Sequence, residues 1–381
     1  MLPIKQKVES VMSSDGNAAV FSFASWLHII SIFYGAVQKV RETCYRQKII
    51  PSQKLPCKVI SIGNITVGGT GKTPLTIHVA QTLKQAGQKV AVVSRGYKGG
   101  AERQGGIVSD GRTLYMDTAL SGDEPCLIAG RLKDVPVIVG KNRFAAGMLA
   151  VRNFQSDVIV LDDAFQHLKL KRDLDFVLLD CMRPFGNTHL LPRGTLREPI
   201  SSLGRGTACV LTRCRTEAAE AKIASIALIK KLRPQCPVFT SSHIPYCYFV
   251  KKGDQIPVGN LSDFLSPSDM AEIKNHKIFA FSGIARNDAF RHTLNTLGFN
   301  TTGFLEFSDH HQYTQNDLAT IVRLAGNSSA DLLITTEKDY VRIAPKKTFP
   351  MDLVVVGVKV SFGNDEQAFF EFIKDRIGIR S

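Results

Sequence analysis

The sequence lacks the signatures of nucleic-acid-binding and disulfide-bonded proteins. It has no zinc-finger, RNA-recognition or helix-turn-helix motif, so nucleic acid is not an expected partner, although the formal net charge is +14. Its eight cysteines are scattered without a CxxC pair. Because disulfide frameworks and structural zinc sites need paired cysteines, we expect reduced thiols in a cytosolic compartment. The positive charge is then typical of a protein that meets an anionic membrane surface or an anionic substrate.

The sequence also lacks repeats and low-complexity tracts. Its 44% hydrophobic and 22% charged residues are typical of a folded globular chain. A length of 381 residues is too long for one ordinary domain and suits two. A cleaved signal peptide is not expected, because Glu9 and Asp15 precede the first apolar run and no small-residue cleavage site is evident.

An uncharged run of twenty residues, AAVFSFASWLHIISIFYGAV, occupies positions 18–37. Six basic residues and the single acid Glu42 follow it up to position 58. An apolar helix with a basic flank is typical of a segment that lies in the interface of an anionic membrane, which is the interpretation that we favour. A helix that spans the bilayer and a buried helix that covers the catalytic domain remain alternatives.

A glycine-rich stretch, KVISIGNITVGGTGKTP at positions 58–74, is the strongest local signal in the chain. Its pattern predicts a buried strand, a tight turn and the first turn of a helix. Gly68, Gly69 and Gly71 let the backbone come close to an anion and turn its N–H groups inward. The N-terminus of the helix adds the positive end of its dipole. We therefore expect a phosphate-binding loop.

The residues that follow the glycines fit a nucleotide. Lys72 supplies a cation for the β- and γ-phosphates, and Thr73 supplies a hydroxyl for Mg²⁺. Pro74 suits the first turn of a helix, where its missing N–H has no partner to lose. The strict pattern G-x-x-x-x-G-K-[ST] is not met, because Thr66 stands where the first glycine belongs. A bland glycine-rich turn is the alternative, and the strand before and the helix after the loop argue against it.

The next part of the chain alternates short apolar strands with amphipathic helices. Strands are predicted near residues 89–94, 135–139 and 158–162, with a helix beginning at Arg143. Almost wholly apolar strands of this kind indicate a parallel sheet that is covered on both faces. Ligands of such sheets bind beyond the carboxyl ends of the strands, and the polar residues of interest follow those ends.

Asp162 and Asp163 come directly after four apolar residues, which is the Walker-B arrangement for holding Mg²⁺. Asp163 could instead cap the turn that follows. Gln166 and His167 lie within one turn of these acids and are expected to face the same cleft. For His167 alone, an ordinary core or surface role is the alternative.

Two loops framed by glycine and proline carry further charged residues. The first, residues 121–125, contains Asp123 and Glu124, and the second, residues 191–199, contains Arg197 and Glu198. Both are predicted to be active-site loops. A solvated or capping role for these acids is the alternative, because Asp and Glu are common in turns.

Several motifs together resemble those of the tetraacyldisaccharide 4'-kinase family, the lipid A 4'-kinases. The resemblance runs in the family's order through most of the chain, and at two positions the sequence departs from it. Asn287 stands where the family commonly has proline, and Ser282 where it often has cysteine, which affects a turn rather than the chemistry. The motifs are GNITVGGTGKTP at 63–74, SRGY at 94–97, GDEP at 122–125, LDDAFQH at 161–167, LREP at 196–199, FSGIA at 281–285, FSDHHQY at 307–313 and TTEKD at 335–339.

The resemblance implies an ATP- and Mg²⁺-dependent kinase of lipid A and lipopolysaccharide biosynthesis. Its acceptor would be the 4'-hydroxyl of an acylated glucosamine disaccharide 1-phosphate, and its product the 1,4'-bisphosphate. Its place would be the cytoplasmic face of the bacterial inner membrane, with the lipid surface as a partner. The resemblance also implies that Asp123 is the base and that His310 raises the basicity of Asp123 by hydrogen bonding.

The expected site residues fall into three groups. The catalytic group is Asp123, His310, Lys72 and Arg143. The ATP-binding group is Thr66, Val67, Gly68, Gly69, Thr70, Gly71, Lys72, Thr73, Gln166, His167 and Arg197. The metal-binding group is Thr73, Asp162, Asp163 and Glu198.

The expected fold class is α/β, with a P-loop NTPase-like parallel-sheet domain and a second, smaller α/β domain. Residues 1–50 would form an N-terminal extension and a membrane-associated helix, and residues 51–235 the P-loop kinase domain. Residues 236–260 would form a two-stranded linker. Residues 261–381 would form the smaller domain, which closes the active-site cleft.

A membrane-associated regulatory ATPase of the deviant P-loop type is the rival interpretation. The signature of that class has a lysine directly before Gly-Gly-x-Gly-Lys-Thr, and here Val67 stands at that position. The missing lysine counts against this class. A nucleotide-binding module without turnover is a third possibility, against which the presence of Asp123 and His310 in the family's motifs argues.

Overall fold

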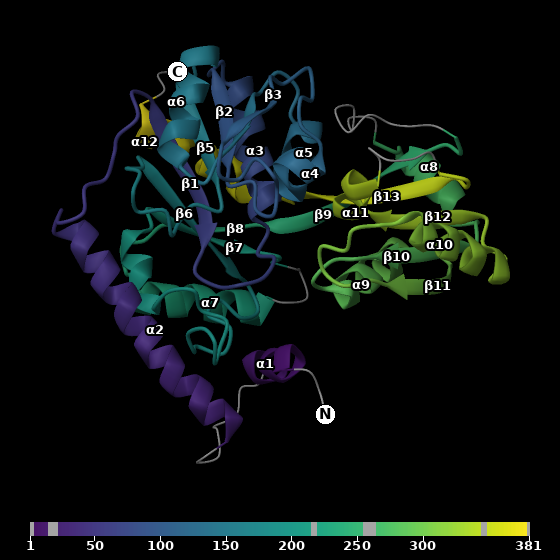
Figure 1. The fold of residues 1–381 in the computed structure, drawn as a ribbon, viewed down its shortest axis with the longest axis horizontal. Coiled ribbons are helices and arrows are strands. Elements are labelled where there is room, and N and C mark those ends of the chain that lie inside the picture. Colours follow the sequence, from purple (N-terminus) through teal and green to yellow (C-terminus); the bar gives the residue numbers. More distant parts are fainter. Residues whose placement is uncertain (1–3, 14–21, 215–218, 254–263, 344–348, 379–381) are drawn as a thin grey trace. The chain divides into compact units, whose positions relative to one another are not determined.

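The computed structural model describes residues 4–13, 22–214, 219–253, 264–343 and 349–378. The chain folds into two compact units, each built from separate stretches of sequence. The colours of Figure 1 follow these stretches along the chain. Unit 1 comprises residues 1–82, 155–243 and 360–381, and unit 2 comprises residues 83–154 and 244–359.

Unit 1 contains five strands in the spatial order β5-β1-β6-β7-β8, and each neighbouring pair is parallel. Four of them, β1, β5, β6 and β7, are short and almost completely buried, which explains why their sequences are continuous apolar runs rather than alternating ones. Their bounds are β1 Lys58–Asn64, β5 Val158–Asp162, β6 Leu174–Asp180, β7 Ala208–Thr212 and β8 Val238–Thr240.

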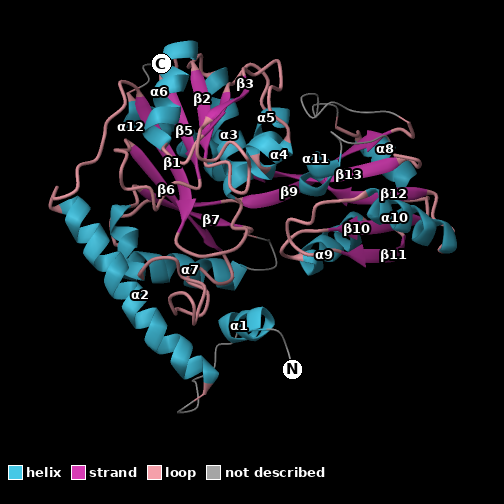
Figure 2. Cartoon of the chain, viewed as in Figure 1, coloured by secondary structure: helices cyan, strands magenta, loops and turns pink. Residues whose placement is uncertain are grey.

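The helices of unit 1 include two at the N-terminus and one at the C-terminus (Figure 2). The C-terminal helix packs on β6, where the rings of Phe369 and Phe176 lie 5.1 Å apart. Their bounds are α1 Ile4–Ser13, α2 Phe23–Arg46, α3 Lys72–Gln85, η1 Ile200–Arg205, α7 Ala219–Leu232 and α12 Glu366–Ile377.

Unit 2 contains two sets of strands. In the first, β2 Val90–Ser94 is parallel to β4 Val137–Val139, and β3 Gly106–Ser109 is antiparallel to β4. The second is a five-stranded sheet in the order β11-β10-β12-β13-β9, in which β10 is parallel to both of its neighbours. Its strands are β9 Ser242–Val250, β10 Ile278–Ser282, β11 Thr301–Glu306, β12 Leu332–Thr336 and β13 Leu353–Ser361.

The core of unit 2 joins the helix that carries Asp123 to the five-stranded sheet. Cys126 and Leu127, in the helix at Asp123–Arg131, belong to the same buried cluster as Phe279 and Phe281 of β10. This packing holds Asp123 against the sheet. The helices of the unit are α4 Thr118–Ser121, α5 Asp123–Arg131, α6 Arg143–Phe154, α8 Pro267–Ile273, α9 Asn287–Leu297, α10 Gln315–Asn327 and α11 Glu337–Ile343, and η4 Gly363–Asp365 lies beyond it in unit 1.

The predicted strands near 89–94, 135–139 and 158–162 are present as β2, β4 and β5. The C-terminal helix α12 belongs to unit 1, although the sequence order assigned it to the smaller domain. The division into 1–50, 51–235, 236–260 and 261–381 stays a prediction. Residues 254–260 of the predicted linker lie outside the described residues.

The structure describes the predicted apolar segment from residue 22 onward, and helix α2 begins at Phe23. Its first turn is capped by Ser22, whose side chain accepts a hydrogen bond from the N–H of Ser25. One face, at Leu27, Ser31 and Gly35, is buried. Within the described ranges, no helix has both the length and the apolar character that crossing a bilayer requires.

Candidate active site

The loop between β1 and α3 has the backbone of a phosphate-binding turn. Gly68 and Gly71 have φ angles of 102° and 87°, in the left-handed region that glycine adopts without strain. The loop is held from two sides: Asn64 Nδ2 donates to Thr70 Oγ1 at 2.9 Å, and Thr212 Oγ1 donates to the carbonyl of Thr70 at 2.9 Å. These contacts hold the loop in shape ahead of any ligand.

Lys72 is the first residue of α3 and is 9% exposed. Its Nζ lies 3.5 Å from Asn64 Oδ1 and 3.7 Å from Asp163 Oδ2. Both contacts are long for hydrogen bonds, so the ammonium group is held at the loop without being strongly committed to either partner. The next residue, Thr73, is buried in the first turn of the helix.

Asp162 ends β5 and is 1% exposed. It accepts a hydrogen bond from Thr76 Oγ1 at 3.2 Å. Because Thr76 lies three residues after Thr73 on α3, this bond brings Asp162 to the face of the helix that carries Thr73. A hydroxyl and a carboxylate oxygen are suitable ligands for Mg²⁺, so Thr73 and Asp162 fit a metal site.

The other two predicted metal ligands are engaged with arginines. Both oxygens of Asp163 accept from Arg197 Nη1 at 3.0 Å, and Glu198 accepts from Arg205 Nη2 at 2.5 Å. Across the described part of the chain, no three His, Cys, Asp or Glu side chains gather as a metal site. Mg²⁺ often binds through one or two carboxylates together with substrate phosphates, so this arrangement is compatible with it. Metal roles for Asp163 and Glu198 stay predictions.

The structure brings the predicted ATP-binding residues of three segments to one loop. Gln166 Nε2 donates to the carbonyl of Asn64 at 2.8 Å and lies 3.4 Å from Glu198 Oε2. The N–H of Arg197 donates to the carbonyl of Ile65 at 2.7 Å. The backbone carbonyl of His167 accepts a hydrogen bond from Arg172 Nη1 at 2.8 Å. This bond does not involve the imidazole ring, so ATP binding by His167 stays a prediction.

A close approach explains how the Gln166 segment reaches β1. A Cβ atom on Gly63 would lie 2.6 Å from Cβ of Phe165, closer than real Cβ contacts allow. Glycine at this position therefore lets the turn after β5 lie directly against β1. In the same turn, Asp163 has a φ angle of 47°, in the left-handed region that Asp adopts more readily than most residues with a side chain.

In unit 2, the structure brings Asp123 and His310 together. Asp123 begins α5, directly after Gly122 with its φ of 84°, and its Oδ2 lies 2.8 Å from His310 Nδ1. The same Oδ2 accepts from Arg342 Nε at 2.7 Å. In the sequence, His310 lies 187 positions and Arg342 lies 219 positions away from Asp123, so the fold of unit 2 brings both to the carboxylate.

The electrostatics correct one expectation. Burial raises the pKa of Asp123, but the hydrogen bond from His310 and the charge of Arg342 together outweigh it, so the pKa lies below its usual value. His310 therefore lowers the basicity of Asp123 instead of raising it, because a donor stabilises the ionised carboxylate. At neutral pH Asp123 is a carboxylate that can accept and orient a hydroxyl.

Arg143 begins α6 and is buried. Its Nη1 donates to the carbonyl of Gly140 at 2.9 Å, which ties the side chain to the turn between β4 and its own helix. This contact does not connect Arg143 to Asp123 or His310. Its expected part in catalysis stays a prediction.

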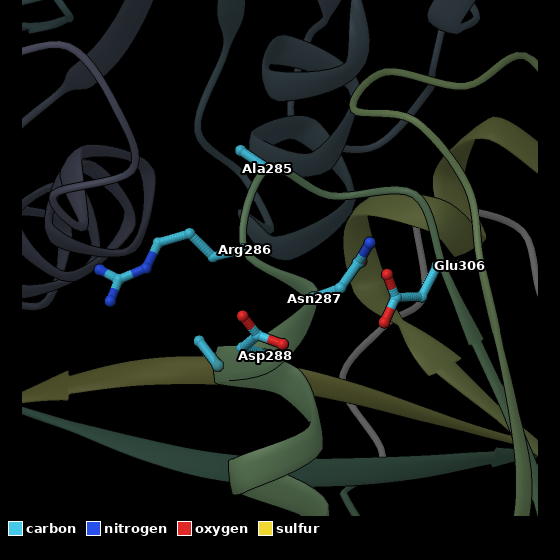
Figure 3. Close-up of a pocket in the computed structure, with 6 residues that line it drawn as sticks. Ala285, Arg286, Asn287, Asp288 and Glu306 are labelled. Atoms are coloured by element: carbon cyan, nitrogen blue, oxygen red, sulfur yellow. The ribbon is translucent and has the colours of Figure 1, made fainter. Parts of the chain in front are cut away.

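A polar cavity of about 330 Å³ lies beside the Asp123 cluster in the fold of unit 2. The carbonyl of Gly283 accepts hydrogen bonds from the N–H of His310 and from Arg342 Nη1. Ala285, two residues after Gly283 in the sequence, is the first residue that lines the cavity. Figure 3 shows Asn287 beside Glu306, with Arg286 extending away from them. The cavity is lined by Ala285, Arg286, Asn287, Asp288, Ala289 and Glu306.

Arg342, the second partner of Asp123, was not among the predicted site residues. It lies three residues after Asp339, the last residue of the TTEKD motif, and that i,i+3 spacing on a short helix was the one available signal. The spacing alone could not show that the guanidinium reaches Asp123, because that contact joins α5 and α11 across the fold.

The comparisons with known proteins show the family of the chain. A family model described as Tetraacyldisaccharide-1-P 4'-kinase matches residues 23–378. The Tetraacyldisaccharide 4'-kinase of Desulfatibacillum aliphaticivorans is 37% identical over 100% of both chains, and that of Pelobacter propionicus is 41% identical over 84% of both. A crystal structure of LpxK from Aquifex aeolicus in complex with ATP has a TM-score of 0.71 at 28% identity, covering 93% of this chain and 100% of that one. The predicted α/β P-loop fold class is thereby confirmed.

Proposed function

The chain belongs to the tetraacyldisaccharide-1-P 4'-kinase family, and on this premise we propose that it phosphorylates the 4'-hydroxyl of an acylated glucosamine disaccharide 1-phosphate with ATP. The product would be the 1,4'-bisphosphate of lipid A biosynthesis. The observation that carries the proposal is the pairing of Asp123 and His310 at 2.8 Å, in a chain that also has a formed phosphate loop.

The phosphate side of the reaction belongs to unit 1. The loop amides and Lys72 would hold the β- and γ-phosphates and balance their charge, which is the main requirement of phosphoryl transfer. Mg²⁺, when bound, supplies further positive charge at these phosphates, and Thr73 and Asp162 would hold it. Arg197 is a further cation at the loop, at present balanced by Asp163.

The acceptor side belongs to unit 2. Asp123 would accept a hydrogen bond from the 4'-hydroxyl, orient its oxygen toward the γ-phosphorus and take the proton as the new P–O bond forms. His310 would keep the carboxylate ionised and in place. Because the residues proposed for ATP and those proposed for the acceptor belong to different units, we expect neither unit to catalyse by itself.

The decisive assay is ATP consumption with and without the acylated disaccharide 1-phosphate. We expect turnover that depends on the acceptor, together with appearance of the bisphosphate. A regulatory ATPase would hydrolyse ATP equally without the acceptor, and that result would overturn the proposal.

We further propose that α2 places unit 1 on the lipid surface of the inner membrane, at its cytoplasmic face. Its buried face contacts the site: Tyr34 Oη donates to the carbonyl of Arg197 at 2.7 Å, and Arg41 Nη2 to the carbonyl of Gln166 at 2.8 Å. Its other face is a stripe of exposed apolar side chains at helical spacing, followed by basic residues that suit anionic headgroups. The stripe is Phe23, Trp26, Ile29, Ile30, Ile32, Phe33, Val37 and Val40.

Replacing Trp26 and Phe33 together by glutamine should weaken vesicle binding at least about tenfold. They are 63% and 70% exposed, and burying one large apolar side chain contributes about 1.5–3 kcal/mol. The measurement is co-sedimentation with vesicles containing anionic phospholipid. Ile223→Gln is the matched control, because Ile223 is 65% exposed on α7 of the same unit and outside the stripe. Unchanged sedimentation of the double variant would place the lipid contact elsewhere.

A further inference from the structure

Arg342 is a buried cation that the proposed mechanism has not used. Its side chain is 1% exposed and makes three hydrogen bonds that converge on the Asp123 cluster. Nε donates to Asp123 Oδ2 at 2.7 Å, while Nη1 donates to the carbonyl of Gly283 at 2.8 Å and to Asp339 Oδ1 at 3.0 Å. One guanidinium thus joins α5, the turn after β10 and its own helix, α11.

Asp339, from the TTEKD motif, holds Arg342 in this orientation. It is fully buried and accepts from the N–H of Gly283 at 3.0 Å, from Tyr313 Oη at 2.9 Å and from Thr336 Oγ1 at 2.5 Å. With so many donors around it, the Asp339 carboxylate has little freedom to turn. The arginine that it binds is therefore presented to Asp123 in one geometry.

The two carboxylate oxygens of Asp123 differ in their hydrogen bonds. His310 and Arg342 both bind Oδ2, and no other described residue donates to Oδ1. We propose that Arg342 is a positioning residue for this carboxylate: it holds Oδ2 together with His310 and so turns Oδ1 toward the acceptor hydroxyl. The inference rests on the proposed function, in which Asp123 receives the proton of that hydroxyl.

Stability alone does not account for this cluster. A buried ion pair is often no more stabilising than apolar side chains of similar volume, because removing the charges from water is costly. Within the described chain, Arg342 Nη2 also has no hydrogen-bond partner, which adds to that cost. The same two helices are already joined by Arg131 with Glu337 at 3.1 Å and by Lys338 with Glu124 at 3.2 Å. A role in orienting Asp123 explains why a third ion pair, with a fully buried arginine, is placed here.

The position of Arg342 has a consequence for the pH dependence. Its charge acts with the His310 hydrogen bond to lower the pKa of Asp123 against the effect of burial. Removing that charge should raise the pKa, so activity should be lost at a higher pH as the solution is acidified. The titratable and charged groups around Asp123 are His310, with Asp309 3.8 Å from its ring, Arg342 and Asp339 on α11, and Cys126, which interacts with both Asp117 and Asp123.

The test compares Arg342→Met with Arg131→Met in the full chain. Both changes remove a buried guanidinium between α5 and α11, but Arg131 pairs with Glu337, whereas Arg342 pairs with Asp123. For Arg342→Met we expect kcat to fall by about a hundredfold, the usual cost of a misplaced reacting group, with the acid limb moved to higher pH and KM for ATP unchanged. Arg131→Met should keep the wild-type pH profile even if it unfolds at a lower temperature. Equal profiles for the two variants would overturn the proposal.

Arg342→Lys separates charge from geometry and still decides the question if the methionine variant does not fold. Lysine keeps the charge but cannot make the three bonds of the planar fork. We expect the acid limb to return toward that of the wild type while kcat stays at least about tenfold low. A lysine variant with wild-type kcat would show that the orientation does not depend on Arg342.

A spectroscopic measurement separates this inference from the proposed function. The ¹³C signal of the Asp123 carboxyl carbon follows the ionisation of Asp123 directly, whether or not the acceptor has been correctly identified. We expect Arg342→Met to shift that titration to higher pH, and an unchanged titration would overturn the inference. If the unmodified protein consumes no ATP with the acceptor, the proposed function fails, and the Asp123 titration still shows whether Arg342 controls the carboxylate.

Discussion

Replacing Lys72 by alanine should abolish phosphoryl transfer, with a loss in kcat of at least about a thousandfold, and Asp162→Ala should act similarly. Lys72 stands at the phosphate loop in long contacts with Asn64 and Asp163, so its charge is available to the nucleotide. Asp162 is a buried carboxylate beside the helix face of Thr73. Both losses come from missing charge in a polar site, so the fold should remain intact.

The measurement is kcat with saturating ATP and acceptor, with thermal unfolding recorded in parallel. Lys84→Ala is the matched control, because Lys84 lies on the same helix and the side chains of its pair with Asp134 are 38% and 39% exposed. Exposed pairs contribute little to stability, so this variant should keep its rate. A Lys72→Ala or Asp162→Ala enzyme with a near-normal rate would contradict the assignment of the site.

Asp123→Asn should lower kcat by about two to four orders of magnitude, the usual contribution of a positioned acid or base. The amide keeps the shape of the side chain but cannot take the proton of the acceptor hydroxyl. Binding of ATP, which we assign to unit 1, should be unaffected. His310→Ala should cost less, because His310 acts through Asp123, and it should move the acid limb to higher pH by removing a hydrogen bond that lowers the Asp123 pKa.

The double variant provides the sharper test of this pair. Once Asp123 is lost, the loss of His310 should add little, because residues that act as a unit give non-additive effects. His311→Ala is the control, since the His311 ring contacts Asp317 at 3.1 Å and stacks on Phe307. Losses that multiply independently would mean that His310 serves the sugar or the nucleotide directly.

Features that depend on neighbouring residues could be predicted from the sequence. The phosphate loop needs glycines at positions of positive φ and a lysine at the start of a helix, all within one short stretch. The Asp162 site needs an apolar strand that ends in a carboxylate, and the α2 stripe follows from helical spacing. Such patterns can be recognised in the sequence because the backbone geometry of a helix or strand alone sets the spacing of the residues on one face.

The contacts that decide the chemistry of Asp123 could not be predicted in this way. Family motifs implied the pairing with His310, but neither motif nor spacing indicated Arg342, which lies 219 positions away. The same holds for α12, which joins unit 1 after the chain has built unit 2, and for Asp163, which binds Arg197 from a distant loop. Each of these depends on which strands become neighbours and where the connections return, and that order is set by the packing of the whole chain rather than by any local pattern. The tertiary structure therefore decided the electrostatics of Asp123, including the sign of the effect that His310 has on it.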